Sequence, residues 1–160
     1  MLKSLDKNHP VALCNGDTLF LDVFAENSPD IDIFAANAYR GNYGFGFLWK
    51  SVRELADKPV FITEYGCPAY ANGKTYKEAE ELQAAYHRGC WEDIRNNMAF
   101  EEGEGNALGG VVFEWVDEWW KASGSNPYQH NKKGEFRGPF LDGWLYEEWM
   151  GITSQGDGSD

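Results

Sequence analysis

The stretch Lys58-Pro59-Val60-Phe61-Ile62-Thr63-Glu64-Tyr65-Gly66 predicts a buried strand that is followed directly by a carboxylate. Its apolar run over 60–63 is typical of a strand inside a sheet, with a proline before it and a Tyr-Gly turn after it. Glu64 stands at the C-terminal end of that run, where loops and chemistry gather in sheets of parallel strands. We therefore interpret Glu64 as a candidate catalytic carboxylate. The alternative is a structural ion pair with an Arg or Lys at the edge of the sheet.

Three more apolar runs predict strands, and helical patterns separate them. Strands are expected over 11–14, 31–36 and 110–115, in addition to 60–63. Helices are expected over 18–26, 45–56 and 76–97, and Thr75 with Glu78 fits a capping box at the start of the last one. Strands that alternate with helices predict an α/β fold in which crossover helices join parallel strands.

The apolar residues of the longer segments have helical spacing. In the second helix they are Phe47, Leu48, Val52 and Leu55. In the third, Ala79, Leu82, Tyr86, Trp91 and Ile94 predict a buried stripe. After Trp120 the periodicity ends. Residues 121–143 are expected to form a long loop, 144–152 a short helix or turn, and 153–160 a frayed tail. No linker or repeat interrupts the chain, so residues 1–160 are predicted to form a single domain.

The composition of the chain indicates which kinds of molecule it could bind. A hydrophobic content of 42% and an aromatic content of 16% argue against disorder. The net charge of −12 would repel nucleic acid and anionic membranes, so neither partner is expected. A neutral ligand such as a carbohydrate is compatible with this charge, although the acidity could equally serve solubility alone. No secretory signal opens the chain, and no apolar run reaches membrane-spanning length.

The cysteines and histidines point to no metal or cofactor. Cys14, Cys67 and Cys90 have no zinc-ligand spacing and allow one disulfide at most. Cys14 lies in the first apolar run and is predicted to be a small buried hydrophobe. The three histidines are scattered along the sequence, and no phosphate-binding loop is present. We therefore expect neither a metal site nor a cofactor.

Polar residues follow the first two predicted strands. Asp17 follows the first strand, and Asn37, Tyr39 and Arg40 follow the second. The phenol of Tyr65 or of Tyr39 could donate a hydrogen bond to Glu64, which would favour the charged carboxylate. Asn37, Tyr39 and Arg40 could also bind hydroxyl groups of a substrate, as could Asn15 and Asp17 at the end of the first strand. Alternatively, Asn37 only caps a turn, Arg40 only pairs with an acid, and Asn-Gly-Asp is an ordinary turn.

The end of the fourth predicted strand mixes carboxylates with tryptophans. Trp115 is a candidate floor for a sugar-binding subsite, and Glu114 is a candidate for orienting the substrate or nearby side chains. Trp119 and Trp120 could do the same or could form a hydrophobic plug under the long loop. A retaining glycosidase needs two carboxylates about 5–5.5 Å apart, so Glu64 would require a partner.

Taken in order, these segments resemble the second half of the catalytic barrel in clan A glycoside hydrolases, which include family 2 β-galactosidases and β-glucuronidases. The runs beginning at Asp6, Asp30, Pro59 and Gly109 look like the fifth to eighth strands of that (β/α)8, or TIM, barrel. The resemblance extends over residues 5–152. It implies that the chain is a partial TIM barrel, that Glu64 is the nucleophile of a retaining glycoside hydrolase, and that Trp115 lines the sugar subsite.

The same resemblance implies that something is missing. In this clan the acid/base glutamate follows an asparagine at the end of the fourth strand, and no matching Asn-Glu pair occurs here. A closed barrel commonly needs about 250 residues. We therefore expect a C-terminal half-barrel fragment that shows little turnover alone. Its open sheet edges could pair with a missing N-terminal half, which we favour, associate with another copy of the chain, or close locally in a different way. The competing hypotheses are a non-catalytic carbohydrate-binding or assembly module with a half-barrel fold, and an unrelated α/β enzyme.

Overall fold

A computed structural model describes residues 2–121 and 130–154. The predicted tail over 155–160 and part of the predicted long loop, 122–129, therefore lie outside the described residues. The chain divides into two compact units. Unit 1 contains Met1–Tyr65 and Cys90–Val111, and unit 2 contains Gly66–Gly89 and Val112–Asp160. Each unit is described by itself, and the single domain expected over 1–160 stays a prediction.

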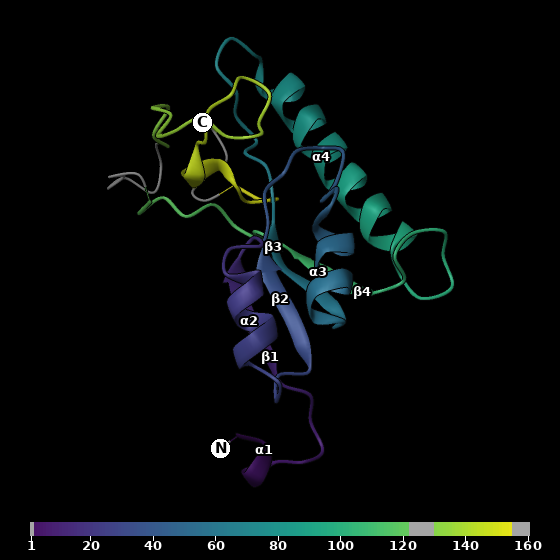
Figure 1. The fold of residues 1–160 in the computed structure, drawn as a ribbon. Coiled ribbons are helices and arrows are strands. Elements are labelled where there is room, and N and C mark those ends of the chain that lie inside the picture. The colour runs from purple at the N-terminus through teal and green to yellow at the C-terminus, as the bar shows by residue number, and fades with distance from the viewer. Residues whose placement is uncertain (1, 122–129, 155–160) are drawn as a thin grey trace. The chain divides into compact units, whose positions relative to one another are not determined.

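Unit 1 is built on a parallel sheet with strand order β1-β2-β3-β4 (Figure 1). The strands are β1 Ala12–Gly16, β2 Ile33–Asn37, β3 Val60–Tyr65 and β4 Ala107–Val112. The first three correspond to predicted strands, with ends shifted by at most two residues. The α/β prediction with parallel strands and intervening helices is confirmed, and the arrangement is consistent with a partial barrel.

The fourth strand was predicted over 110–115, three residues too late at both ends. Two glycines, Gly109 and Gly110, weaken the strand signal at its centre, whereas the sequence after them is aromatic and apolar. Gly110 is required because a larger residue would not fit against the neighbouring helix. A Cβ atom at Gly110 would lie 2.6 Å from Cδ1 of Ile94 on the neighbouring helix. Glu114 and Trp115 therefore follow the strand and are not part of it.

Helices cover one face of the sheet in unit 1. They are α2 Leu21–Asn27, α3 Leu48–Ala56 and the last residues of α4 Tyr76–Asn96, and a short α1 Leu2–Leu5 was not predicted. The predicted starts at 18 and 45 were three residues early, because both segments open with turns. Phe20, just before α2, has a positive φ of 58°. Phe24 of α2 packs edge-on against Phe34 of β2, with 5.1 Å between ring centroids.

The burial of apolar residues in the longer helices follows the helical spacing only in part. In α3, Leu48, Trp49 and Val52 are buried, whereas Phe47 and Leu55 are exposed. In α4 the buried residues are Ala79, Gln83, Tyr86, Cys90 and Ile94, while Trp91 is 47% exposed and Leu82 is half-buried. Because each helical residue turns by about 100°, burying Cys90 directs the adjacent Trp91 away from the core.

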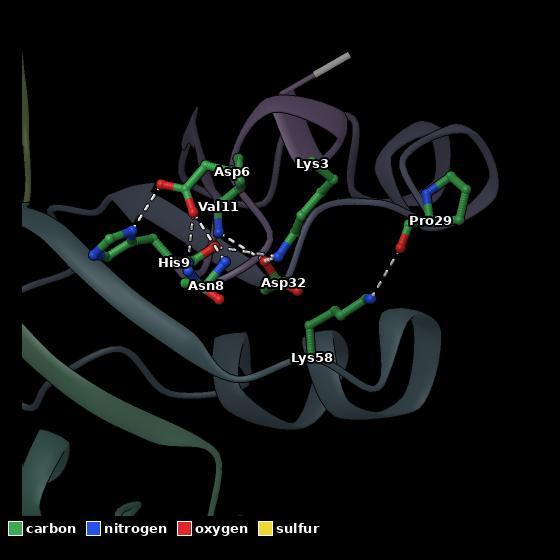
Figure 2. Close-up of polar contacts among 8 residues, drawn as sticks. All are labelled: Lys3, Asp6, Asn8, His9, Val11, Pro29, Asp32 and Lys58. Carbon is green, nitrogen blue, oxygen red and sulfur yellow. Dashed lines mark hydrogen bonds and ion pairs between the residues drawn. The ribbon is translucent and has the colours of Figure 1, made fainter.

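Polar contacts tie together the segments that lead into the first strands (Figure 2). Lys3 forms an ion pair with Asp32, which also accepts a 2.7 Å hydrogen bond from the backbone N–H of Val11. The bonds from Lys3 and Val11 lower the pKa of Asp32. Lys58 donates to the carbonyl of Pro29 at 3.5 Å. These contacts involve no predicted site residue and anchor the amino ends of β1 and β2.

Unit 2 contains the first part of α4 and the segment after β4. The predicted capping box is confirmed: the backbone N–H of Thr75 donates to Oε2 of Glu78 at 2.8 Å, and that of Glu78 to Oγ1 of Thr75 at 3.3 Å. The predicted short helix or turn over 144–152 contains the 3-10 helix η1 Glu147–Trp149. Trp149 stacks on Tyr70 and Tyr76, with centroids 5.0 and 5.9 Å away.

No helix in the described part of the chain is long and apolar enough to cross a membrane. No group of three or more His, Cys, Asp or Glu side chains within 2–121 and 130–154 could hold a metal ion.

Candidate active site

Glu64 occupies the end of β3, and an irregularity in the strand decides which way it faces. The register pairs Ala36 with Ile62 and then Asn37 with Glu64, so that Thr63 has no partner of its own in β2. This is a β-bulge, a feature that re-aims side chains and is common beside active sites. Glu64 consequently shares a face of the sheet with Asn37 and not with Ile62.

The two faces of the sheet differ sharply in burial. On the helix-covered face, Phe34, Ala36, Val60 and Ile62 are all fully buried. The other face, which we call the open face, carries Cys14, Ala35, Asn37, Phe61, Thr63 and Glu64. The small Ala35 is buried, and the other five side chains are partly or largely exposed. A carboxylate on the open face keeps contact with solvent and can be reached by a ligand.

Of the two tyrosines predicted as donors to Glu64, Tyr39 makes the contact, and Tyr65 is buried. The phenol oxygen of Tyr39 donates a hydrogen bond to Oε2 of Glu64 at 3.0 Å. The backbone N–H of Ala38 also donates to the carbonyl oxygen of Glu64 at 2.9 Å, so that the residues after β2 and the end of β3 are joined through both backbone and side chain. No ion pair to Glu64 is found among the described residues, which disfavours the alternative of a structural Arg or Lys partner.

Asn37 lies at the centre of a second group of contacts on the open face. Its Oδ1 accepts hydrogen bonds from Oγ1 of Thr63 at 2.7 Å and from Sγ of Cys14 at 3.2 Å. The thiol and the hydroxyl are themselves 3.0 Å apart. The prediction that Cys14 is buried is wrong: β1 is an outer strand of the sheet, and its open-face side chains are exposed.

Asp17 forms an ion pair with Arg40 at the ends of β1 and β2. Nε of Arg40 donates to Oδ2 of Asp17 at 2.9 Å, and Nη1 donates to the carbonyl of Phe45 at 2.8 Å. Burial works to raise the pKa of Asp17, but the hydrogen bonds and charge of Arg40 outweigh it and hold the pKa below its ordinary value. Asp17 is thus engaged within the protein, and Arg40 pairs with an acid.

An open pocket of about 580 Å³ adjoins this ion pair. Its walls include Leu19, Tyr43 and Phe47, in addition to Asp17 and Arg40. The guanidinium of Arg40 lies 4.2 Å from the ring centroid of Phe47. The pocket therefore offers mainly apolar and aromatic surface at the same end of the sheet as Tyr39.

Glu114 and Trp115 belong to unit 2. Trp115 is 72% exposed, as a stacking platform would be. Burial and the neighbouring Glu118 carboxylate raise the pKa of Glu114 to about 8, against the opposing effect of Lys121. The structure thus brings Asn37, Tyr39 and Glu64 together, with Asp17 beside them, and it describes Glu114 and Trp115 within the second unit.

Sequence reasoning missed two groups of residues. The contacts of Thr63 and Cys14 depend on a bulge, for which the apolar pattern of β3 gives no signal. In unit 2, Nε2 of His130 lies 3.1 Å from Oδ2 of Asp117, and both side chains are buried. Oδ1 of Asp117 accepts a 2.7 Å hydrogen bond from the backbone N–H of Gly151. No His-Asp spacing in the sequence indicates this pair.

Comparison with known proteins identifies the fold. No family model and no curated protein matches the chain. Among solved structures, it is similar to parts of glycoside hydrolases. An uncultured Clostridium sp. β-glucuronidase aligns over 96% of this chain and 24% of its own, with 19% identity and a TM-score of 0.52. A Ruminococcus gnavus β-glucuronidase in complex with D-glucuronic acid aligns over 95% and 25%, with 15% identity and a TM-score of 0.51.

A third similar structure is a GH2 β-galacturonidase from Eisenbergiella tayi bound to galacturonate. It aligns over 72% of this chain and 21% of its own, with 19% identity and a TM-score of 0.51. This chain has a glycoside hydrolase-like fold. It spans about a quarter or less of the length of the structures it resembles, and identities below 20% extend the likeness to the fold alone.

Proposed function

We propose that this chain is the nucleophile-bearing part of a retaining glycoside hydrolase, with Glu64 as the nucleophile. The observation that carries the proposal is the contact of Glu64 with Tyr39 at the C-terminal end of β3, on the open face of the sheet. The fold shared with three glycosidases supports it. A rigid strand end is also the kind of position that holds a nucleophile in a productive geometry.

The proposed chemistry follows from the two oxygens of Glu64. Tyr39 binds Oε2, which leaves Oε1 to attack the anomeric carbon of a bound sugar. A glycosyl ester to Glu64 forms as the bond to the leaving oxygen breaks and a second carboxylic acid protonates that oxygen. The resulting carboxylate then removes a proton from water, which hydrolyses the ester and releases Glu64.

We propose that this second carboxylate lies in a further part of the barrel that pairs with the present chain. In unit 1, Asp17 is a carboxylate beside the Tyr39 segment, and it forms an ion pair with Arg40. An acid/base residue must lie within about 5–5.5 Å of the nucleophile. Asp17 is unsuited to donate a proton because the pKa of its carboxyl is lowered.

The first substrates to test are β-glycosides of uronic acids. The names of the similar structures give glucuronides and galacturonides as the compounds on which those proteins act. The open face presents the amide group of Asn37 and the phenol of Tyr39, which suit a sugar. Trp115, exposed in unit 2, is proposed as a stacking surface for the sugar ring, and Glu114 as its orienting partner.

Covalent labelling tests the proposal directly. A 2-deoxy-2-fluoro-glucuronosyl or galacturonosyl donor with a dinitrophenolate leaving group needs no protonation of that group, so trapping depends on the nucleophile and on sugar binding. The chain is incubated with the donor alone and together with a barrel half that supplies an Asn-Glu strand end. Peptide mass spectrometry is expected to find the fluorosugar on Glu64 in the combined sample.

The controls separate catalysis from binding. Glu64→Gln should abolish the adduct, whereas Glu54→Gln, at an exposed position on α3, should leave it unchanged. Sugar binding without any adduct in the combined sample would contradict the enzyme and favour a carbohydrate-binding module. An adduct on a different carboxylate would contradict the assignment of Glu64.

A further inference from the structure

We infer that Thr63 is a positioning residue for Glu64: its hydroxyl fixes the β3 bulge that turns the Glu64 carboxylate onto the open face. Thr63 carries no charge and touches no reacting atom in the proposed chemistry. Thr63 matters because it is the residue of β3 that has no partner in β2, and this extra residue shifts the register at Glu64. The inference concerns the orientation of Glu64 and relies on the proposed function only for its kinetic consequence.

The register shows what the bulge changes. Side chains alternate between the faces of a strand, so residues two apart share a face. Phe34 and Ala36 of β2 lie opposite Val60 and Ile62 of β3, all on the helix-covered face. Unbroken alternation from Ile62 would put Glu64 on that face, where an unpaired carboxylate would be costly to bury.

With the bulge, Glu64 takes its place opposite Asn37 instead. Asn37 is two residues beyond Ala35, whose partner is Phe61 of the open face. Two residues of β3, Thr63 and Glu64, therefore face the region of one residue of β2, as bulges require. The 3.0 Å hydrogen bond from Tyr39, which also stands two residues beyond Asn37, confirms that Glu64 has turned to this side.

The Thr63 side chain binds the bulge to the neighbouring strands. Its Oγ1 donates to Oδ1 of Asn37 at 2.7 Å and lies 3.0 Å from Sγ of Cys14, so that one hydroxyl connects β3 to β2 and to β1. Bulges lose a ladder contact at the extra residue. The side-chain contacts of Thr63 replace that loss and make the bulged register the stable one.

The arrangement also assigns a role to Asn37. Its Oδ1 accepts from both Thr63 and Cys14, so this oxygen is already engaged by the protein. Asn37 is thus the acceptor that holds Thr63, and its contribution to Glu64 is indirect. A misplacement of about 1 Å at a reacting group can slow a reaction by about 100-fold.

The first test uses the unmodified chain and NMR. Cross-strand nuclear Overhauser contacts are expected to place Asn37 opposite Glu64, and contacts between the Tyr39 ring and the Glu64 side chain are expected as well. A register that places Asn37 opposite Thr63 would overturn the inference without any variant. This arm needs no sugar, so its result stands whether or not Glu64 proves to be a nucleophile.

The second test compares Thr63→Val with Thr63→Ser. Valine keeps the shape and removes the hydroxyl, whereas serine keeps the hydroxyl. Thr63→Val is expected to shift the ¹³C signal of the Glu64 carboxyl and to remove its contact with the Tyr39 ring, and Thr63→Ser to retain both. A Thr63→Val chain that keeps both signals would overturn the inference. Asn37→Ala removes the acceptor in place of the donor and should give the same loss.

Fluorosugar labelling supplies the kinetic readout. In the combined sample, Thr63→Val is expected to lower the rate constant of adduct formation about tenfold or more, with a dissociation constant for the donor within about threefold of the original. Thr63→Ser should restore the rate. An equal loss of rate in both variants would indicate a packing role and contradict positioning by the hydroxyl.

Discussion

Tyr39 and Thr63 act on Glu64 in different ways at the scale of single residues. Tyr39 contacts the carboxylate itself through a 3.0 Å hydrogen bond, whereas Thr63 contacts Asn37 and acts through the backbone. The Tyr39 contact holds one oxygen of the carboxylate. The Thr63 contact sets the face of the sheet toward which the Glu64 side chain points. Both depend on side chains within a few residues of strand ends, where parallel strands bring distant parts of the sequence together.

Glu114 provides a prediction about pH at this scale. Burial and Glu118 raise the pKa of Glu114 to about 8, above its ordinary value of 4.5. The folded state therefore binds the proton more tightly than the unfolded state. The resulting stabilisation is complete below about pH 4.5 and is lost as the pH rises through about 8.

The prediction is that the free energy of unfolding falls between pH 5 and pH 8.5 and that Glu114→Gln removes part of this fall. The expected difference is about 1 kcal/mol, because the side chain is partly exposed and solvent screens the repulsion. Urea titrations at the two pH values measure it. Glu101→Gln, at an exposed position, serves as the control, and an identical pH dependence in both variants would refute the prediction.

The elements that support the site are short strands and one long helix with an interrupted apolar stripe. Sequence periodicity locates all four strands and the three longer helices, because alternating and helical patterns are local properties. Periodicity places two helix starts too early, where turns precede the helices. It also misses the polar side chain among the buried residues of α4. Gln83 occupies that position, and nothing in its local sequence distinguishes it from an exposed glutamine.

Gln83 yields a prediction at the scale of elements. In unit 2 its amide group donates to the carbonyls of Cys67 and Gly151, both at 2.9 Å, and the side chain is buried. Gln83→Leu would leave both carbonyls without this donor. The expected loss is about 2–3 kcal/mol of unfolding free energy, measured by urea denaturation. Glu81→Leu, on the exposed side of α4, should cost less than about 0.5 kcal/mol, and equal costs would refute the prediction.

At the scale of the whole molecule, the sheet has outer strands with exposed apolar residues. β1 pairs with β2 on one side, and its other side faces no strand of the described chain. Leu13 of β1, Phe20 just before α2 and Val23 of α2 are 42%, 71% and 50% exposed. Unpaired strand edges with apolar neighbours favour association with another chain.

We predict that the chain alone associates in a concentration-dependent way and that a complementary barrel half suppresses this association. Sedimentation velocity between about 5 and 100 µM measures both effects, a range in which micromolar affinities are visible. The double variant Leu13→Lys/Val23→Lys should shift the chain toward monomer, because charges on an edge oppose pairing. Leu55→Lys, on exposed α3 surface, should not. A monomer at every concentration would contradict the prediction.

The sequence by itself determined the alternation of strands and helices, the capping box at Thr75 and the position of Glu64 at a strand end. These follow from patterns that span a few neighbouring residues. The tertiary structure alone decided that Cys14 is exposed, that Asp17 is paired and that Glu64 turns toward Tyr39. Those outcomes depend on hydrogen bonds between residues more than 20 positions apart, and on a one-residue change of register that no local pattern encodes.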